Sequence, residues 1–113
     1  MAKTTQDLVT RVLQKLVSLE PGQDPSSEDD AFITDVWATV NANLRVEKIS
    51  TWTDNSIPNE VFEPLANYLK EYLWEEYKGA RQNNAAFVDA ALPKLRAAVA
   101  KRYMGNPVKA DYY

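Results

Sequence analysis

The chain has 113 residues, of which 26% are charged, and it contains neither histidine nor cysteine. These absences exclude a histidine general base, a cysteine nucleophile and any disulfide bond. The net charge of −3 argues against a free-standing nucleic-acid binder, which usually carries a basic excess. We therefore expect a single domain that acts through its surfaces, with no enzymatic activity, cofactor or metal.

The first predicted helix covers residues 5–18. Thr4 or Thr5 can cap it, and Asp7 lies in its first turn, where a carboxylate suits the helix dipole. Its apolar residues recur every three or four positions, which indicates one buried stripe. The stripe consists of Leu8, Val9, Val12, Leu13, Leu16 and Val17. Two prolines and a glycine within residues 20–26 then end the helix.

A second helix is predicted to be capped by Ser26 or Ser27 and to carry three acids in its first turn. These acids are Glu28, Asp29 and Asp30. A metal site there is disfavoured, because consecutive helix residues point in different directions and the acids already stabilise the helix dipole. The apolar face of this helix comprises Phe32, Ile33, Val36, Trp37, Val40 and Leu44.

Residues 46–56 lose the helical period and are predicted to form a long connecting loop. Its two large apolar side chains allow two interpretations. In the first, Ile49 and Trp52 pin the loop over the core. In the second, the loop projects and Trp52 inserts into a partner. We favour the first interpretation.

The third predicted helix is entered through Ile57–Pro58, with Ser56 or Ile57 near the cap, and it ends at Gly79. Pro64 lacks a backbone N–H, which predicts a kink or a delayed start. The apolar stripe of this helix comprises Val61, Phe62, Leu65, Ala66, Leu69, Tyr72, Leu73 and Tyr77.

The last predicted helix begins at Asn83–Asn84, has a basic outer face, and is stopped by the Gly-Asn-Pro stretch at residues 105–107. Its apolar residues are Phe87, Val88, Ala91, Leu92, Leu95, Val99 and Tyr103. The elements together predict an all-α protein, a compact bundle of about four helices with a long connecting loop. Residues 1–104 form this helical domain, and residues 105–113 form an extended C-terminal arm that is either disordered or becomes ordered on a partner.

The N-terminus lacks the hydrophobic stretch of a signal peptide, and no apolar run approaches the roughly 20 residues that a membrane span needs. We therefore expect a soluble, intracellular protein without a membrane partner.

Charge is unevenly distributed along the chain. Residues 21–63 carry nine acids against two bases, a net charge of −7, whereas residues 79–113 carry six bases against two acids, a net charge of +4. The acidic segment of one copy could attract the basic segment of another. The alternative is a monomer with two solvated faces. The residues expected at such an inter-subunit contact are Glu28, Asp29, Asp30, Arg96, Lys101 and Arg102.

Three short motifs stand out in the first two thirds of the chain: Asp-Leu-Val-Thr-Arg-Val-Leu-Gln-Lys-Leu at residues 7–16, Pro-Ser-Ser-Glu-Asp at 25–29, and Ile-Pro at 57–58 leading to Leu-Ala at 65–66. Together they resemble the head-to-tail adaptor, or connector, family of tailed phages, which includes packaged-DNA stabilisation and tail accessory proteins of short-tailed phages. The resemblance covers residues 5–78, and Val17 stands where that family has a glycine.

The resemblance implies a viral structural protein of the virion, located in the neck between head and tail and assembled in the host cytoplasm. Twelve copies would form an oligomeric ring under the portal protein, extend the channel for DNA without sequence-specific binding, and dock a tail or nozzle protein. By its position, the C-terminal segment would be the portal-binding arm. The arm residues are Tyr103, Pro107, Val108, Lys109, Tyr112 and Tyr113.

Two other functions are weighed against this one. A small helical regulatory or DNA-binding module would use the basic last helix, with Lys94, Arg96, Lys101 and Arg102. A carboxylate-based hydrolase would need two acids that face each other. Glu75 and Glu76 do not suit this role, because a helix splays adjacent residues apart. We rank the hydrolase last.

Overall fold

The computed structural model describes residues 2–17, 20, 22–23 and 25–104, with side chains described as far as Lys101. Within these residues the chain forms five α-helices and no strand, and one isolated antiparallel bridge joins Lys3 to Ile57. The helices are α1 (Thr5–Leu16), α2 (Ser27–Val46), α3 (Asn59–Tyr72), α4 (Trp74–Lys78) and α5 (Asn84–Met104). The predicted all-α class is confirmed. The described residues form five helices instead of the predicted four or so, because the third predicted helix is divided into two.

Helix α1 begins with a capping box. The Thr4 hydroxyl accepts a hydrogen bond from the backbone N–H of Asp7, and the Asp7 carboxylate accepts one from the backbone N–H of Thr4. The predicted stripe is buried from Leu8 to Leu16. Val17 is exposed, because the helix ends at Leu16 and Val17 takes the C-cap position. Its assignment to the stripe was therefore wrong.

Helix α2 begins after Ser26, whose hydroxyl accepts a hydrogen bond from the backbone N–H of Asp29. Its buried apolar residues are Ile33, Trp37, Val40 and Leu44. Phe32 was predicted to share this face, but it is 40% exposed. Adjacent helix residues lie about 100° apart, so Ile33 takes the core position and Phe32 is turned outward.

The loop between α2 and α3 is held against α2 by polar contacts. The indole Nε1 of Trp37 donates to the carbonyl of Asp54 at 2.9 Å, and the Asn41 amide donates to the Asp54 carboxylate at 2.7 Å. Ser50 donates to the Asn41 side-chain oxygen at 2.6 Å. Both Asn41 and Ser50 are buried, so these bonds satisfy groups that would otherwise destabilise the core.

Trp52 lies in this loop and is only 6% exposed. The interpretation that Ile49 and Trp52 pin the loop over the core is confirmed, because both side chains belong to the buried cluster. The alternative, in which Trp52 contacts a partner from a projecting loop, is wrong for this conformation. The Trp52 indole nitrogen is buried without a hydrogen-bond partner among the described residues.

The third predicted helix is divided at Leu73, where the backbone has φ −97° and ψ 3°. Its first part, α3, starts at Asn59. Pro58 occupies the N-cap position and makes no side-chain cap hydrogen bond. Pro64 lies inside α3. Its second part, α4, ends at Gly79, whose φ of +90° favours glycine. Leu73 stays buried across the division.

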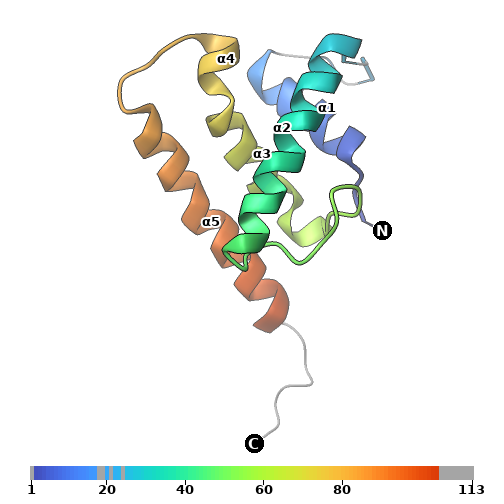
Figure 1. Cartoon of the computed structure of the whole chain (residues 1–113), viewed down its shortest axis with the longest axis vertical. Coiled ribbons are helices and arrows are strands. Elements are labelled where there is room, and N and C mark those ends of the chain that lie inside the picture. Colours follow the sequence, from blue (N-terminus) through green and yellow to red (C-terminus); the bar gives the residue numbers. More distant parts are fainter. Residues whose placement is uncertain (1, 18–19, 21, 24, 105–113) are drawn as a thin grey trace, which may run out of the picture.

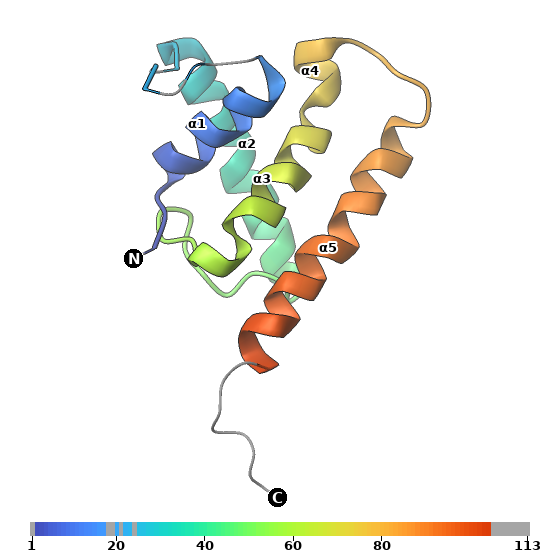
Figure 2. The same cartoon turned by 180° about the vertical axis from the view of Figure 1, so that it is seen from behind.

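Helix α3 is central in the arrangement, since it packs against α1 and α5, while α1 also packs against α2. The two opposite views place α2 in front in Figure 1 and behind α1 and α3 in Figure 2. Helix α5 lies at the edge of the molecule, and Leu95 and Val99 are the only buried residues among its described side chains. None of the helices in the described ranges is both long and apolar enough to cross a membrane.

Candidate functional site

Of the three acids at the start of α2, Asp29 contacts α4. Glu28 is exposed, while Asp29 and Asp30 are partly buried. The Tyr77 hydroxyl of α4 donates to the Asp29 carboxylate at 3.0 Å. Burial and this hydrogen bond together raise the pKa of Tyr77 to about 12. Asp29 therefore joins α2 to α4 within one chain, and Glu28 is the most accessible of the three acids.

The predicted basic residues lie far from these acids. Arg96 of α5 donates to the Glu47 carboxylate at 3.2 Å, at the opposite end of α2. The length of α2 puts about 30 Å between its first turn and this contact. Lys101 is exposed. The structure thus does not bring the predicted acidic and basic sets together within one chain.

Several of the predicted site residues lie partly or wholly outside the described residues. The side chains of Arg102 and Tyr103 are outside the described set, although both residues belong to α5. Five predicted arm residues lie outside the described residues altogether. They are Pro107, Val108, Lys109, Tyr112 and Tyr113.

The outer face of α2 is acidic and otherwise built of small or apolar residues. We call the α2 face the row of exposed residues made of Glu28, Ala31, Phe32, Asp35, Ala38, Thr39, Ala42 and Val46. The other exposed residues of α2 are Ser27, Thr34, Asn43 and Arg45, and the whole helix contains four acids and this one base. Val46 is 81% exposed. A helix surface that is both apolar and solvent-exposed is typical of an interaction site.

A groove of about 440 Å³ is lined by α3 and α5, and α2 lies on the other side of the molecule from these two helices (Figures 1 and 2). We call it the α3–α5 groove. Its lining residues are Glu63, Pro64, Asn67, Lys70, Glu71, Phe87, Ala90, Ala91 and Lys94. Phe87, at 48% exposed, gives the groove a large apolar side chain in contact with solvent.

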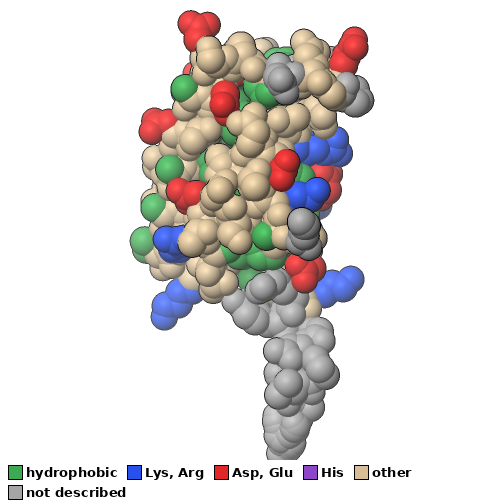
Figure 3. Space-filling model, turned by 90° about the vertical axis from the view of Figure 1, so that its right-hand side faces the viewer, with side chains coloured by type: hydrophobic (Ala, Val, Ile, Leu, Met, Phe, Trp, Pro, Cys, Tyr) green, Lys and Arg blue, Asp and Glu red, His purple; other side chains and the backbone are tan. Residues whose placement is uncertain are grey.

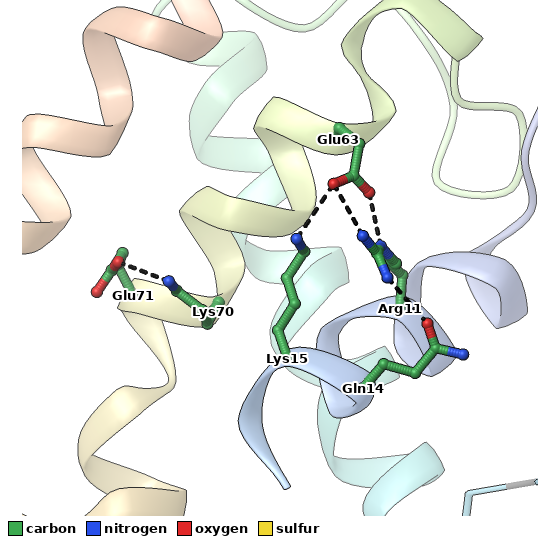
Figure 4. A network of polar contacts seen from close by, with 6 residues as sticks. All are labelled: Arg11, Gln14, Lys15, Glu63, Lys70 and Glu71. Carbon is green, nitrogen blue, oxygen red and sulfur yellow. Dashed lines mark hydrogen bonds and ion pairs between the residues drawn. The ribbon is translucent and has the colours of Figure 1, made fainter. Parts of the chain in front are cut away.

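At one border of the groove, Glu63 is held by two cations of α1 (Figure 4). Arg11 approaches it with Nε at 2.7 Å from Oε1 and a second nitrogen at 3.2 Å from Oε2, and Lys15 Nζ lies 3.1 Å from Oε2. The hydrogen bonds from Arg11, and then those from Lys15, outweigh burial and lower the pKa of Glu63 to about 2.

The low pKa of Glu63 predicts a defined pH dependence of stability. Because the folded-state pKa lies below the ordinary value of 4.5, the ion pairs stabilise the fold above about pH 4.5 and lose this contribution as the pH falls towards 2. The Glu63 side chain is half exposed, so we expect Glu63→Gln to cost less than about 1 kcal/mol at neutral pH.

Urea unfolding of wild type and Glu63→Gln at several pH values measures this contribution. The difference between the two proteins is expected to shrink between pH 4.5 and 2. Glu75→Gln is the matched control, since Glu75 is exposed and has no ion pair among the described residues. An equal, pH-independent effect of both substitutions would contradict the assignment.

At the other border of the groove, Arg81 joins α3, α4 and α5. Its guanidinium carbon lies 4.3 Å from the ring centre of Trp74 and 4.1 Å from that of Phe87. Arg81 also donates to the Glu71 carboxylate and to the Asn84 side chain. Burial opposes ionisation of Glu71, but the hydrogen bonds from Arg81 and Lys70 outweigh it and lower the Glu71 pKa.

The groove and its borders carry a net positive charge in an acidic protein. The two acids Glu63 and Glu71 are surrounded by five bases, a net charge of +3. These bases are Arg11, Lys15, Lys70, Arg81 and Lys94. Figure 3 shows the molecule from one side, with acidic side chains alone at its upper end and acidic and basic side chains side by side lower down.

Sequence reasoning named Lys94 but missed the rest of this cluster. The spacing of Arg11 and Lys15, four residues apart, was the available signal that both lie on one face of α1. Their partner Glu63 is 52 and 48 residues away, so the contact depends on how α1 packs against α3.

The basic borders of the groove and its exposed Phe87 make it suitable for an acidic, partly apolar binding partner.

The carboxylates of Glu63 and Glu71 are positioned to stabilise the fold. Glu63 and Glu71 are each ion-paired with two cations, which keeps both carboxylates ionised at neutral pH. In the described part of the chain, no three acidic residues are arranged to hold a metal ion.

Comparison of the chain with protein family models, with curated proteins and with solved structures gave no significant match. The function therefore has to be inferred from the surfaces of the molecule itself.

Proposed function

We propose that this chain is a structural head-to-tail adaptor of a tailed phage. Copies of it would form a ring under the portal protein, extend the DNA channel, and dock a tail or nozzle protein. The observation that carries the proposal is the pair of unlike surfaces on one small helical domain, the acidic α2 face on one side and the α3–α5 groove with its basic borders on the other. The motif resemblance in residues 5–78 supports the same function.

Two unlike surfaces on opposite sides favour a head-to-tail assembly. When one surface of a copy binds the other surface of its neighbour, each added copy again presents a free surface. Such contacts generate a closed ring when the rotation between neighbours closes, and an open filament when it does not. A ring with an open centre is the form that an adaptor between a portal and a tail requires.

Helix α5 supports the second part of the proposal, which is attachment to a larger assembly. Most of its described side chains are exposed, and it leads directly into the proposed arm, residues 105–113. Under this proposal the arm binds the portal protein. The ring in turn presents its remaining surfaces to the tail.

The DNA-binding alternative receives less support from the geometry. It requires the cations of α5 to face nucleic acid, yet Arg96 is paired with Glu47. The four acids of α2, two of them on the α2 face, would also repel phosphates. An adaptor that lets DNA pass needs no strong phosphate contact, so the net charge of −3 fits this role better than it fits a DNA-binding module.

Light scattering coupled to size-exclusion chromatography tests the proposal. The protein is measured alone over a range of concentrations and then mixed with the portal protein of the same phage. We expect an assembly many times the monomer mass of 12.8 kDa, alone or on the portal. A 12.8 kDa species under all these conditions would contradict the proposal. Tight, salt-sensitive DNA binding by that monomer would favour the regulatory module.

A further inference from the structure

We infer that the α2 face of one copy packs into the α3–α5 groove of the next copy. The inference rests on the proposed function, because it identifies the contact through which the ring is built. The groove is occupied by a second copy of this chain. Four properties of the two surfaces support this contact: apolar side chains, charge, free charged side chains, and position.

Both surfaces have an apolar part. The middle of the α2 face is built of Ala31, Ala38 and Ala42, which allow another element to approach the helix closely. The groove offers Pro64, Phe87, Ala90 and Ala91 between its charged borders. Packing a narrow helix face into a groove of this kind buries apolar surface that each copy otherwise exposes to water.

The charges of the two surfaces are opposite. The helix that bears the α2 face carries four acids between residues 27 and 44, and the groove with its borders carries a net charge of +3. Unlike charges on facing surfaces speed association and fix which surfaces meet. The same charges repel two α2 faces from each other and two grooves from each other, so a symmetric two-fold contact is disfavoured.

Free charged side chains are present on both surfaces. Glu28 and Asp35 on the α2 face, and Lys94 in the groove, are exposed and make no ion pair or side-chain hydrogen bond with other described residues. The cations that already hold Glu63 and Glu71 remain in place. A neighbouring copy can thus pair with Lys94 without disrupting any contact of the folded chain.

The position of the two surfaces determines the type of assembly. They lie on opposite sides of the molecule, so one copy can use both at once, each with a different neighbour (Figures 1 and 2). The contact is therefore heterologous, and it repeats from copy to copy.

Two blocking variants test the contact. In the face variant, Ala31→Arg and Ala38→Arg place long cations on the α2 face. In the groove variant, Asn67→Arg and Ala90→Arg place them on the two walls of the groove. All four positions are exposed and helical, and arginine is a good helix former, so both variants are expected to fold. The matched control is Thr53→Arg with Ala85→Arg, at exposed positions outside both surfaces.

We expect wild type and control to assemble, and each blocking variant alone to remain at 12.8 kDa. An equimolar mixture of the two variants should stop at twice this mass, because the intact face of one variant fits the intact groove of the other and the blocked surfaces repel. Assembly of both variants to the wild-type size, or a mixture that remains monomeric, would overturn the inference. Wild type that never assembles would instead contradict the proposed function.

A zero-length carbodiimide cross-link on assembled wild type provides a second measurement that needs no variant. A mixture of ¹⁵N-labelled and unlabelled protein distinguishes links between copies from links within one copy. We expect cross-links between a labelled and an unlabelled copy that join Lys94 of one to Asp35 or Glu28 of the other. Mixed-isotope links in the assembly that avoid Lys94 and join other surfaces would overturn the inference.

Discussion

Replacement of Trp37 by alanine is expected to lower the free energy of unfolding by about 3–5 kcal/mol, a large part of the stability of a domain of this size. Trp37 has the largest of the fully buried side chains. Its indole nitrogen also donates to the carbonyl of Asp54, which joins α2 to the loop that leads into α3. The substitution thus removes apolar contacts, leaves a cavity and deletes one of the two hydrogen bonds that the Asp54 carbonyl accepts, the other coming from the Thr5 hydroxyl.

Two phenylalanine variants separate these effects. Trp37→Phe keeps most of the ring but loses a satisfied hydrogen bond, whereas Trp52→Phe removes an indole N–H that has no partner among the described residues. Trp37→Phe is therefore expected to be the more destabilising of the two in urea unfolding. Val46→Ala, at an 81% exposed position, should change stability by less than about 0.5 kcal/mol. Equal losses for the two tryptophans would contradict the role of the Asp54 contact.

The second large effect is expected at Leu95. This residue is fully buried, and within the described part of α5 it shares that burial with Val99 alone. Because α5 packs chiefly against α3, Leu95→Ala removes much of what holds it in place. The expected cost is about 2–5 kcal/mol, and much of it should appear as local detachment of α5.

Hydrogen exchange with mass spectrometry distinguishes local detachment from global unfolding. In Leu95→Ala, the amides of α5 should lose protection while those of α1 and α2 keep most of theirs. Ala97→Ser, at an exposed position of the same helix, is the control and should leave the exchange pattern close to that of wild type. A uniform loss of protection across all helices would show that α5 unfolds only with the rest of the domain. Detachment would also open the α3–α5 groove, so Leu95→Ala is expected to weaken assembly.

Local sequence patterns determined the helices themselves. Thr4 and Ser26 were predicted as possible caps and are caps, because capping depends on residues within one turn. The stripe from Leu8 to Leu16 is buried as its spacing predicts, and Ile49 and Trp52 hold the long loop over the core. These features follow from interactions between neighbours in the chain or from the tendency of large apolar side chains to leave water.

The tertiary structure alone decided where the surfaces lie. The division of the third helix at Leu73 and the outward turn of Phe32 could not be read from periodicity, because both positions fit an apolar stripe. The uneven distribution of charge along the chain predicted an acidic and a basic region, but it did not predict which residues form each surface. The basic borders of the α3–α5 groove come from α1 and from the link before α5, and the contact between Arg11 and Glu63 spans 52 residues. Pairings of this kind depend on how helices pack, and helix periodicity carries no information about which helix becomes the neighbour of which.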